Sequence, residues 1–184
     1  MTAGLMRRHR SFWVMTVLVI VAACSSPQVG YDFDRGADFN RYRTYAWLSA
    51  AQQTTGDKRL DSSLVNARIR AAVDAQLRMK GYLASQNGPP DFLIAYHAGM
   101  KDLMKGASTQ NYIGDRAHGT FTTISDVQPY HEGTLTIDIV DAASRQLIWQ
   151  ASATADVEQG LSPEERDSRI KNVVRAMLAH FPPQ

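Results

Sequence analysis

The sequence of 184 residues predicts an α+β fold with two layers, in which two helices cover one face of a mostly antiparallel sheet. Two observations lead to this fold class. Several segments alternate apolar and polar residues, as half-buried strands do. Two longer segments instead repeat apolar residues every three or four positions, as one-sided helices do. The predicted order of elements is β-β-α-β-loop-β-β-α.

The first predicted elements are two strands and a helix. Gln28–Asp34 alternates apolar and polar residues, and Thr44–Leu48 is rich in aromatic and β-branched residues. After a polar connection, Asp61 or Ser62 can cap a helix, and Gly81 suits the left-handed position just past its end. The apolar stripe of this helix consists of Val65, Ile69, Ala72, Val73 and Leu77.

The middle of the chain combines one regular segment with one irregular segment. Asp91–His97 is a continuous apolar run after Pro and Gly, which predicts a central strand buried on both faces. Residues 98 to 132 show no sustained period, and we expect a long loop there. Such loops are usually functional, so the loop and its rim are the predicted binding surface. The candidate binding residues are His97, His118, Tyr130 and His131.

Order returns towards the C-terminus. Gly133–Asp141 and Gln146–Ala153 alternate and are separated by a turn, which predicts a hairpin. Ser162, Pro163 and Glu165 then form the start of a helix with a capping box.

The N-terminus predicts a targeting segment. Three arginines precede the uncharged run Phe12–Ala23, which is too short to span a bilayer and suits a signal peptide. The end of this run together with the next residue, Val21-Ala22-Ala23-Cys24, resembles a bacterial lipobox. The resemblance implies that residues 1–23 are removed and that Cys24 is acylated, with Ser25 typical of lipoproteins of the outer membrane that face the periplasm. A free reactive thiol and a buried structural cysteine are the alternatives for Cys24.

Cleavage also sets the domain organisation and the charge. Residues 1–23 are the predicted signal peptide, residues 24–28 a tether, and residues 29–184 a single domain. Without the three arginines of the signal peptide, 17 basic residues face 18 acidic ones. This balance gives no reason to expect a nucleic-acid partner.

A second resemblance covers nearly all of the mature chain, from about Val29 to Pro183. The motifs that carry it are Tyr31–Asp34, Ala37–Phe39, Tyr42–Trp47, Lys80–Tyr82, Asp91–Tyr96, Glu132–Asp141, Ile148–Trp149 and Phe181–Pro183. With these motifs the sequence resembles the family catalogued as domain of unknown function 4136, whose members are mostly bacterial envelope lipoproteins with no assigned reaction. The resemblance therefore implies no catalytic residue.

The chemistry-bearing residues favour structural roles. Aromatic residues between Phe39 and Trp47 are spaced to pack into a core with Trp149, and a ligand cage is the alternative. Asp32 and Asp34 suit turns and caps better than calcium. Zinc bound by the three histidines would require the loop to fold back over a strand end. We therefore predict no metal, no cofactor and no enzymatic activity.

Two functions remain. The first is a lipid-anchored, non-catalytic envelope module, attached to the membrane through Cys24, that binds an envelope protein or peptidoglycan. The alternative is a periplasmic module that binds a small ligand or a metal, with hydrolase activity as an extension.

Overall fold

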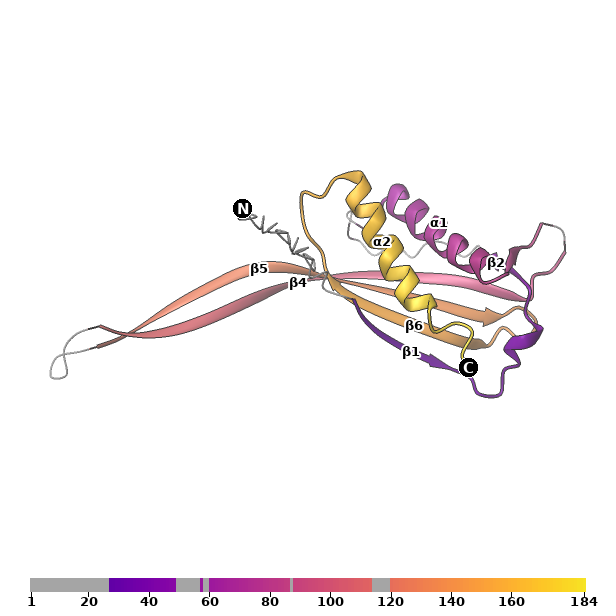
Figure 1. Ribbon diagram of the computed structural model, residues 1–184, viewed down its shortest axis with the longest axis horizontal. Helices are drawn as coiled ribbons and strands as arrows, with labels where there is room; N and C mark the ends of the chain where they lie inside the picture. The colour runs from indigo at the N-terminus through magenta and orange to yellow at the C-terminus, as the bar shows by residue number, and fades with distance from the viewer. Residues whose placement is uncertain (1–26, 49–56, 58–59, 87, 114–119) are drawn as a thin grey trace, which may run out of the picture.

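The computed structural model describes residues 27–48, 57, 60–86, 88–113 and 120–184 (Figure 1). The predicted signal peptide, Cys24 and His118 lie outside these residues. In chain order the elements are β1 (Gln28–Phe33), the short 3-10 helix η1 (Phe39–Arg41), β2 (Thr44–Trp47), α1 (Ser63–Met79), β3 (Leu83–Ala84), β4 (Phe92–Ile113), β5 (Thr120–Asp141), β6 (Leu147–Asp156) and α2 (Pro163–Leu178).

The six strands form one sheet in the order β1-β6-β5-β4-β2-β3. The pairs β1–β6, β6–β5 and β5–β4 are antiparallel, whereas β2 runs parallel to both β4 and β3. Both helices lie on one side of this sheet (Figure 1). The predicted α+β class with a mostly antiparallel sheet is therefore confirmed.

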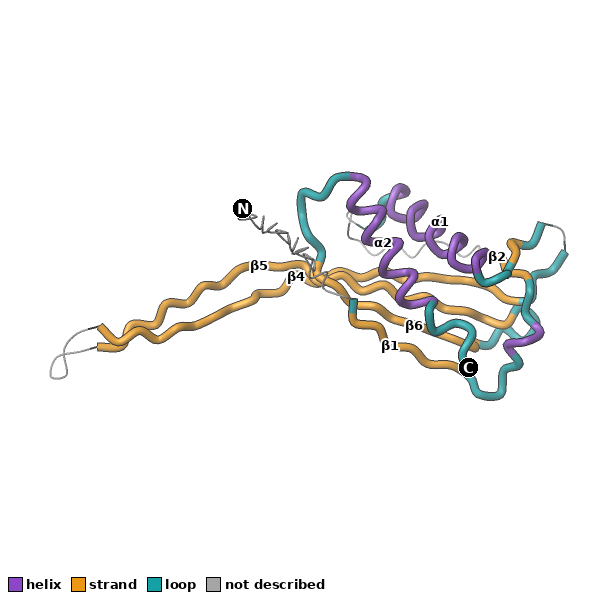
Figure 2. The backbone as a smooth tube through the Cα atoms, in the orientation of Figure 1, coloured by secondary structure: helices purple, strands orange, loops and turns teal. Residues whose placement is uncertain are grey.

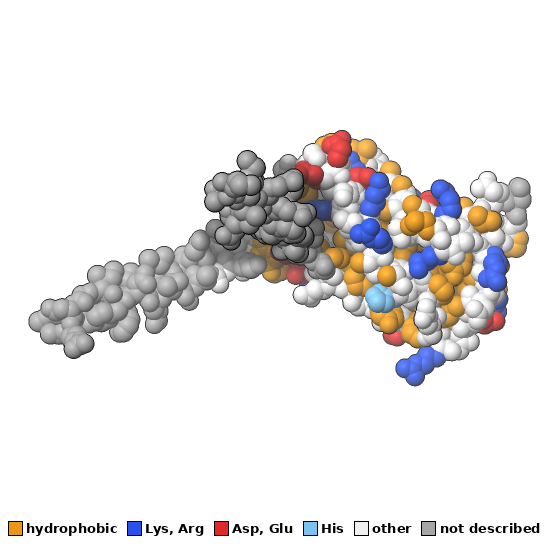
Figure 3. Space-filling view, in the orientation of Figure 1, with side chains coloured by type: hydrophobic (Ala, Val, Ile, Leu, Met, Phe, Trp, Pro, Cys, Tyr) orange, Lys and Arg blue, Asp and Glu red, His pale blue; other side chains and the backbone are white. Residues whose placement is uncertain are grey.

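Local sequence signals set the ends of the helices. The Ser62 side chain accepts a hydrogen bond from the Leu64 backbone, and Gly81 follows α1 with a φ of 90°. At α2, Ser162 and Glu165 form the predicted capping box. The basic side chains of the helical layer are scattered over its surface, with no compact basic patch in the view of Figure 3. This dispersion fits solvated side chains.

The core lies between the helices and the sheet. Trp149 and Phe92 are fully buried, and their rings meet the Phe181 ring at centroid distances of 5.3 Å and 5.9 Å. Tyr42 and Tyr45 each pack a ring 5.8 Å from that of Phe92. The predicted aromatic core is confirmed, and its rings fill the space that a ligand cage would need.

The predicted loop over residues 98 to 132 is wrong. β4 and β5 are each 22 residues long and pair without interruption from Phe92↔Asp141 to Ile113↔Thr120. β6 ends opposite Glu132, so the twelve pairs from Asp102↔His131 to Ile113↔Thr120 form a ribbon of two strands, which we call the arm. The arm projects beyond the rest of the sheet (Figure 2) and is about 40 Å long at 3.3 Å per residue. The order also gains β3, a strand of two residues.

The base of the arm is tied to the connection between β6 and α2. The Val157 backbone donates a hydrogen bond of 2.7 Å to the His131 carbonyl, and Gln159 contacts the His131 ring. Gly133 lies so close that a Cβ there would be 2.7 Å from a methyl group of Val157. Glycine therefore lets the connection pass directly over the strand.

The opposite end of the sheet is held by two carboxylates. Asp141 is 3% exposed, and its Oδ1 accepts hydrogen bonds from the Ala143 backbone and from the Ser144 backbone and hydroxyl. Its Oδ2 accepts from the Tyr42 hydroxyl at 2.9 Å and from Arg41.

Asp91 has the equivalent role at the start of β2. Its Oδ2 accepts from the Arg43 backbone and from the backbone and hydroxyl of Thr44, all at 2.8–2.9 Å. These bonds lower the pKa of Asp91 below its ordinary value, led by the bond from the Thr44 backbone. The two carboxylates thus connect the segment before β2 with β4 and with the turn after β5.

Replacing Asp141 with Asn should lower the free energy of unfolding by about 2–4 kcal/mol at pH 7. The reason is that the buried side chain loses its negative charge, whereas Arg41, Tyr42 and Ser144 still donate hydrogen bonds to this position. Urea unfolding measures the change. Asp167→Asn is the matched control, because Asp167 forms only an exposed pair with Lys171 and should change stability by less than about 0.5 kcal/mol.

The loss of stability in the Asp141→Asn variant should also depend on pH. Hydrogen bonding by Ser144 holds the pKa of Asp141 well below its ordinary value in the folded state, against the opposite effect of burial. The stabilisation is therefore complete above the unfolded pKa of about 3.9 and is lost as pH falls towards the folded value. The stability difference between wild type and Asp141→Asn should shrink below about pH 4. A difference that stays constant from pH 7 to pH 3 would contradict this assignment.

Candidate functional site

The sheet has one covered face and one face that no helix of the described chain covers (Figure 1). Along β6, Trp149, Ala151 and Ala153 are buried beneath the helices. Side chains alternate along a strand, so Gln150 and Ser152 point to the other side. We call that side the open face.

Polar side chains from three neighbouring strands meet on the open face. The Gln150 amide donates to Asp138 Oδ1 at 2.7 Å, and His97 Nε2 lies 3.2 Å from Asp138 Oδ2. Thr136 and Ser152 share a hydrogen bond of 2.7 Å between their hydroxyls. Asp138 has a side-chain exposure of 15% and His97 of 46%. The cluster is therefore held in place by internal bonds while its outer edge remains accessible.

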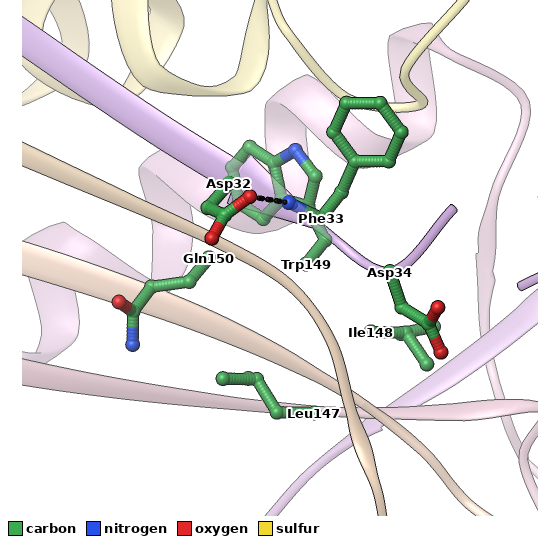
Figure 4. Close-up of a pocket in the computed structure, with 7 residues that line it drawn as sticks. All are labelled: Asp32, Phe33, Asp34, Leu147, Ile148, Trp149 and Gln150. Carbon is green, nitrogen blue, oxygen red and sulfur yellow. Dashed lines mark hydrogen bonds between the residues drawn. The ribbon is translucent and has the colours of Figure 1, made fainter. Parts of the chain in front are cut away.

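A cavity of about 260 Å³ lies beside this cluster, where β1 ends and β6 begins (Figure 4). Ile139 pairs with Trp149 and Val140 with Leu147, so Ile148 is an extra residue in β6. Bulges of this kind redirect side chains. The residues that line the cavity are Asp32, Phe33, Asp34, Leu147, Ile148, Trp149 and Gln150.

The cavity has a polar side and an apolar side. Asp32 and Gln150 are partners across β1 and β6, and Asp32 Oδ1 already accepts from the Phe33 backbone at 2.8 Å. Leu147 is 48% exposed and supplies an aliphatic surface. The cavity can therefore offer hydrogen-bond acceptors beside an apolar contact.

Two other carboxylates near β1 act as caps. Asp34 Oδ1 accepts from the Gly36 backbone at 2.8 Å, and Asp38 Oδ1 accepts from the Asn40 backbone at 3.1 Å. The predicted turn and capping roles of this region are confirmed. Within the described ranges, no group of three or more His, Cys, Asp or Glu side chains is placed to hold a metal ion.

The predicted binding residues do not form one site. His97 lies on the open face, opposite Thr136, whereas His131 lies at the base of the arm with its Nδ1 at 2.6 Å from Asp102 Oδ1. Five residue positions along β5 separate Thr136 from His131, which is about 17 Å. Tyr130 is the neighbour of His131 in β5 and pairs with Leu103. The structure therefore leaves His97 apart from Tyr130 and His131, and these two neighbours in β5 point to opposite faces of the strand.

Sequence reasoning missed Asp138 as the partner of His97 and Gln150 as the second partner of Asp138. Alternation in Gly133–Asp141 placed Asp138 on the polar face of its strand, which was the available signal. The partner of that face depends on how strands pair, and a single sequence does not give this pairing.

Neither helix of the described chain has the length and apolar character needed to cross a membrane.

A family model described as "Domain of unknown function (DUF4136)" matches residues 29–183. No curated protein matches the sequence. Among solved structures, the chain is similar to a PDZ domain protein from Parabacteroides distasonis ATCC 8503, with a TM-score of 0.56 and 15% identity. That match covers 86% of this chain but only 37% of the other, so the chain spans about a third of its length. At this identity the likeness shows the fold alone.

Weaker similarity extends to two structures of the PelC dodecamer from Paraburkholderia phytofirmans. One is a PelC variant, with a TM-score of 0.48 and 10% identity, covering 83% of this chain and 95% of that one. The other has a TM-score of 0.46 and 12% identity, covering 83% and 96%.

Treatment of the purified protein with EDTA should leave its unfolding midpoint unchanged within about 1 °C. The reason is that Asp34 and Asp38 are committed to backbone amides, and His97 and His131 lie apart. Thermal unfolding followed by circular dichroism measures the midpoint. A decrease of several degrees that added zinc or calcium restores would contradict the prediction.

Proposed function

We propose, from the premise that this chain belongs to the family described as domain of unknown function DUF4136, that it is a non-catalytic lipoprotein of the bacterial envelope. In this proposal Cys24 is acylated and attaches the mature chain to the periplasmic side of the outer membrane. The module binds an envelope protein or peptidoglycan. The N-terminal sequence supports the anchor, because an uncharged run follows three arginines and ends at Val21-Ala22-Ala23-Cys24.

The open face is the observation that carries the binding role. Sheets of this type normally cover one face with a core and leave the other in water. Here the uncovered face presents His97, Asp138 and Gln150 in an arrangement held by the 2.7 Å hydrogen bond from Gln150 to Asp138 and by the 3.2 Å contact between His97 and Asp138. Side chains that are ordered before binding lose less conformational entropy when a partner arrives. The open face is therefore prepared for recognition.

A non-catalytic role agrees with the chemistry of this cluster. Both oxygens of Asp138 are engaged, one by Gln150 and the other by His97. The Thr136 and Ser152 hydroxyls bond to each other. His97 and Asp138 could act as a base and the group that orients it, but a hydroxyl nucleophile must also hydrogen-bond to that base, and the bond shown for Thr136 and Ser152 is the one that joins them to each other.

The cavity supports a second candidate function, which is binding of a small ligand. Its volume of about 260 Å³ is close to the lower end of the range for ligand pockets, about 300–1,000 Å³. Asp32 and Gln150 would accept hydrogen bonds from such a ligand, while Leu147 would contact its apolar side. This candidate differs from the first in the size of the bound partner.

Substitution of Cys24 with Ser should abolish acylation and leave the protein uncleaved or mislocalised. The physical reason is that the hydroxyl cannot replace the thiol that carries the lipid. Membrane fractionation and metabolic labelling with a palmitate analogue measure the outcome. Substitution of the adjacent Ser26 with Ala is the control and should leave both unchanged. Normal fractionation of Cys24→Ser would overturn the proposed anchor.

A photo-crosslinking residue introduced at Ser152 should capture a discrete envelope component in living cells. Ser152 is placed on the open face, whereas Lys171 is exposed on α2 and provides the control position. Asp138→Ala, which removes the acceptor shared by His97 and Gln150, should reduce capture at Ser152 at least about fivefold. Capture that is equal at both positions, or absent at Ser152, would contradict the proposal. Loss of capture on adding a small envelope metabolite would instead support the cavity.

A further inference from the structure

The chain enters the folded body close to the arm. Gln28, the first residue of β1, pairs with Thr154, and Thr154 pairs with Thr134. The arm leaves the sheet just beyond Glu132, two positions from Thr134, which is about 7 Å along the strand. Figure 1 shows the same arrangement, because β1 starts near the point where β4 and β5 leave the body.

The tether that precedes β1 is short. Four residue steps separate Cys24 from Gln28, and a fully extended chain of that length spans at most about 14 Å. An acylated Cys24 therefore holds the lipid surface within about 14 Å of the start of β1. The arm is about 40 Å long, nearly three times that reach.

The anchor thus attaches at the junction between body and arm. The body extends from this junction in one direction and the arm in the other (Figure 2). A lipid surface that passes within about 14 Å of the junction allows no upright orientation in which the arm and the body both stay outside the lipid. The molecule must lie with its long axis along the surface, or the arm must enter it.

The composition of the distal arm fits this position. Residues 106–113 and 120–125 contain no Asp, Glu, Lys or Arg, whereas these four charged residue types make up 21% of the whole chain. Tyr112 pairs with Phe121 next to the last pair of the ribbon. Tyrosine and tryptophan are enriched at the boundary between lipid and water, phenylalanine is an apolar side chain that lipid accommodates, and charged side chains inside lipid are unfavourable.

We propose that the distal arm, residues 106–113 and 120–125, binds the lipid surface to which Cys24 is anchored. This inference rests on the acylation of Cys24 proposed above. It leaves the open face available for a protein or cell-wall partner. A two-stranded ribbon is at best marginally stable alone in water, and the lipid contact provides the surface against which the arm is ordered.

The test uses the acylated protein reconstituted into vesicles of phosphatidylcholine and phosphatidylglycerol. A cysteine introduced at Asn111 carries a fluorophore, and doxyl-labelled phospholipid serves as the quencher. The matched control carries the label at Arg35, in the turn after β1 at the end of the body remote from the arm. We expect quenching at position 111 to be at least threefold stronger than at position 35. Equal quenching at the two positions would overturn the inference.

A double variant tests the aromatic pair. Tyr112→Ser with Phe121→Ser should reduce quenching at position 111 at least twofold. Met79→Ser with Leu83→Ser is the control, because these side chains are 71% and 63% exposed on the body, and it should leave quenching unchanged. An unchanged signal in the double arm variant would show that the aromatic residues make no lipid contact and would count against the proposal.

Flotation of the vesicles separates failure of this inference from failure of the anchor. Protein that floats but is not quenched at position 111 retains its anchor and refutes the arm contact. Protein that does not float lacks the anchor, and both proposals fail. Quenching that disappears when the protein is diluted to one molecule per vesicle would identify a second copy of the chain as the partner of the arm and would overturn the lipid contact.

Discussion

The hydrogen bonds of Asp141 are the constraint on which the rest of the structure depends. This buried carboxylate joins the turn after β5 to Arg41 and Tyr42, about a hundred residues earlier in the chain. Asp91 makes a similar connection from β4 to the start of β2. A slip of one residue in a strand would turn its apolar side chains to the wrong face. Because both carboxylates bind backbone groups at defined positions, they fix the register at this end, and the ladder of β4 and β5 carries it into the arm.

The register fixed there also divides the sheet into two chemically different faces. Ile137 and Ile139 of β5 are fully buried with Trp149 beneath the helices, and Asp138, which lies between them, points the other way. Asp138 accepts a hydrogen bond from Gln150 on β6 and contacts His97 on β4. The apolar residues of one face stabilise the fold by leaving water. The polar residues of the other face are oriented by the same strands without being needed for that burial.

The elements that bury apolar side chains can be predicted from the sequence, whereas β3 and the arm cannot. α1 and α2 have an apolar stripe and capping residues, and they begin where Ser62 and Ser162 indicate. β1 and β6 coincide closely with their alternating segments, and β2 coincides with the segment rich in aromatic and β-branched residues. β3 has only two residues, which is too short for a periodic signal. Tyr112 and Phe121 pair within the arm, but no helix of the described residues covers the arm (Figure 1), and its sequence lacks the alternation by which strands are recognised.

The candidate site follows the same rule. The apolar run that is visible in the sequence predicts a buried strand ending at His97, but β4 continues to Ile113, so His97 lies within the strand. Its contact with Asp138 depends on the pairing of β4 with β5, and pairing between distant segments is not encoded in a local pattern. The separation of His97 from His131 has the same origin, since an extended arm keeps the two apart where a folded loop could have joined them.

No described helix lies over the arm (Figure 1), so packing beneath the helices does not explain the identities of its residues. In the body, a residue such as Ile94 is restricted by its buried neighbours, and its identity reports on packing. Along residues 106–113 and 120–125 the ladder supplies backbone bonds, and no described helix lies over it (Figure 1). A surface strand in water usually carries charged side chains on its edges, which keep other strands from pairing with it. The distal arm, residues 106–113 and 120–125, carries no such charges on either strand, and the lipid contact proposed above would cover the edges that these charges otherwise protect.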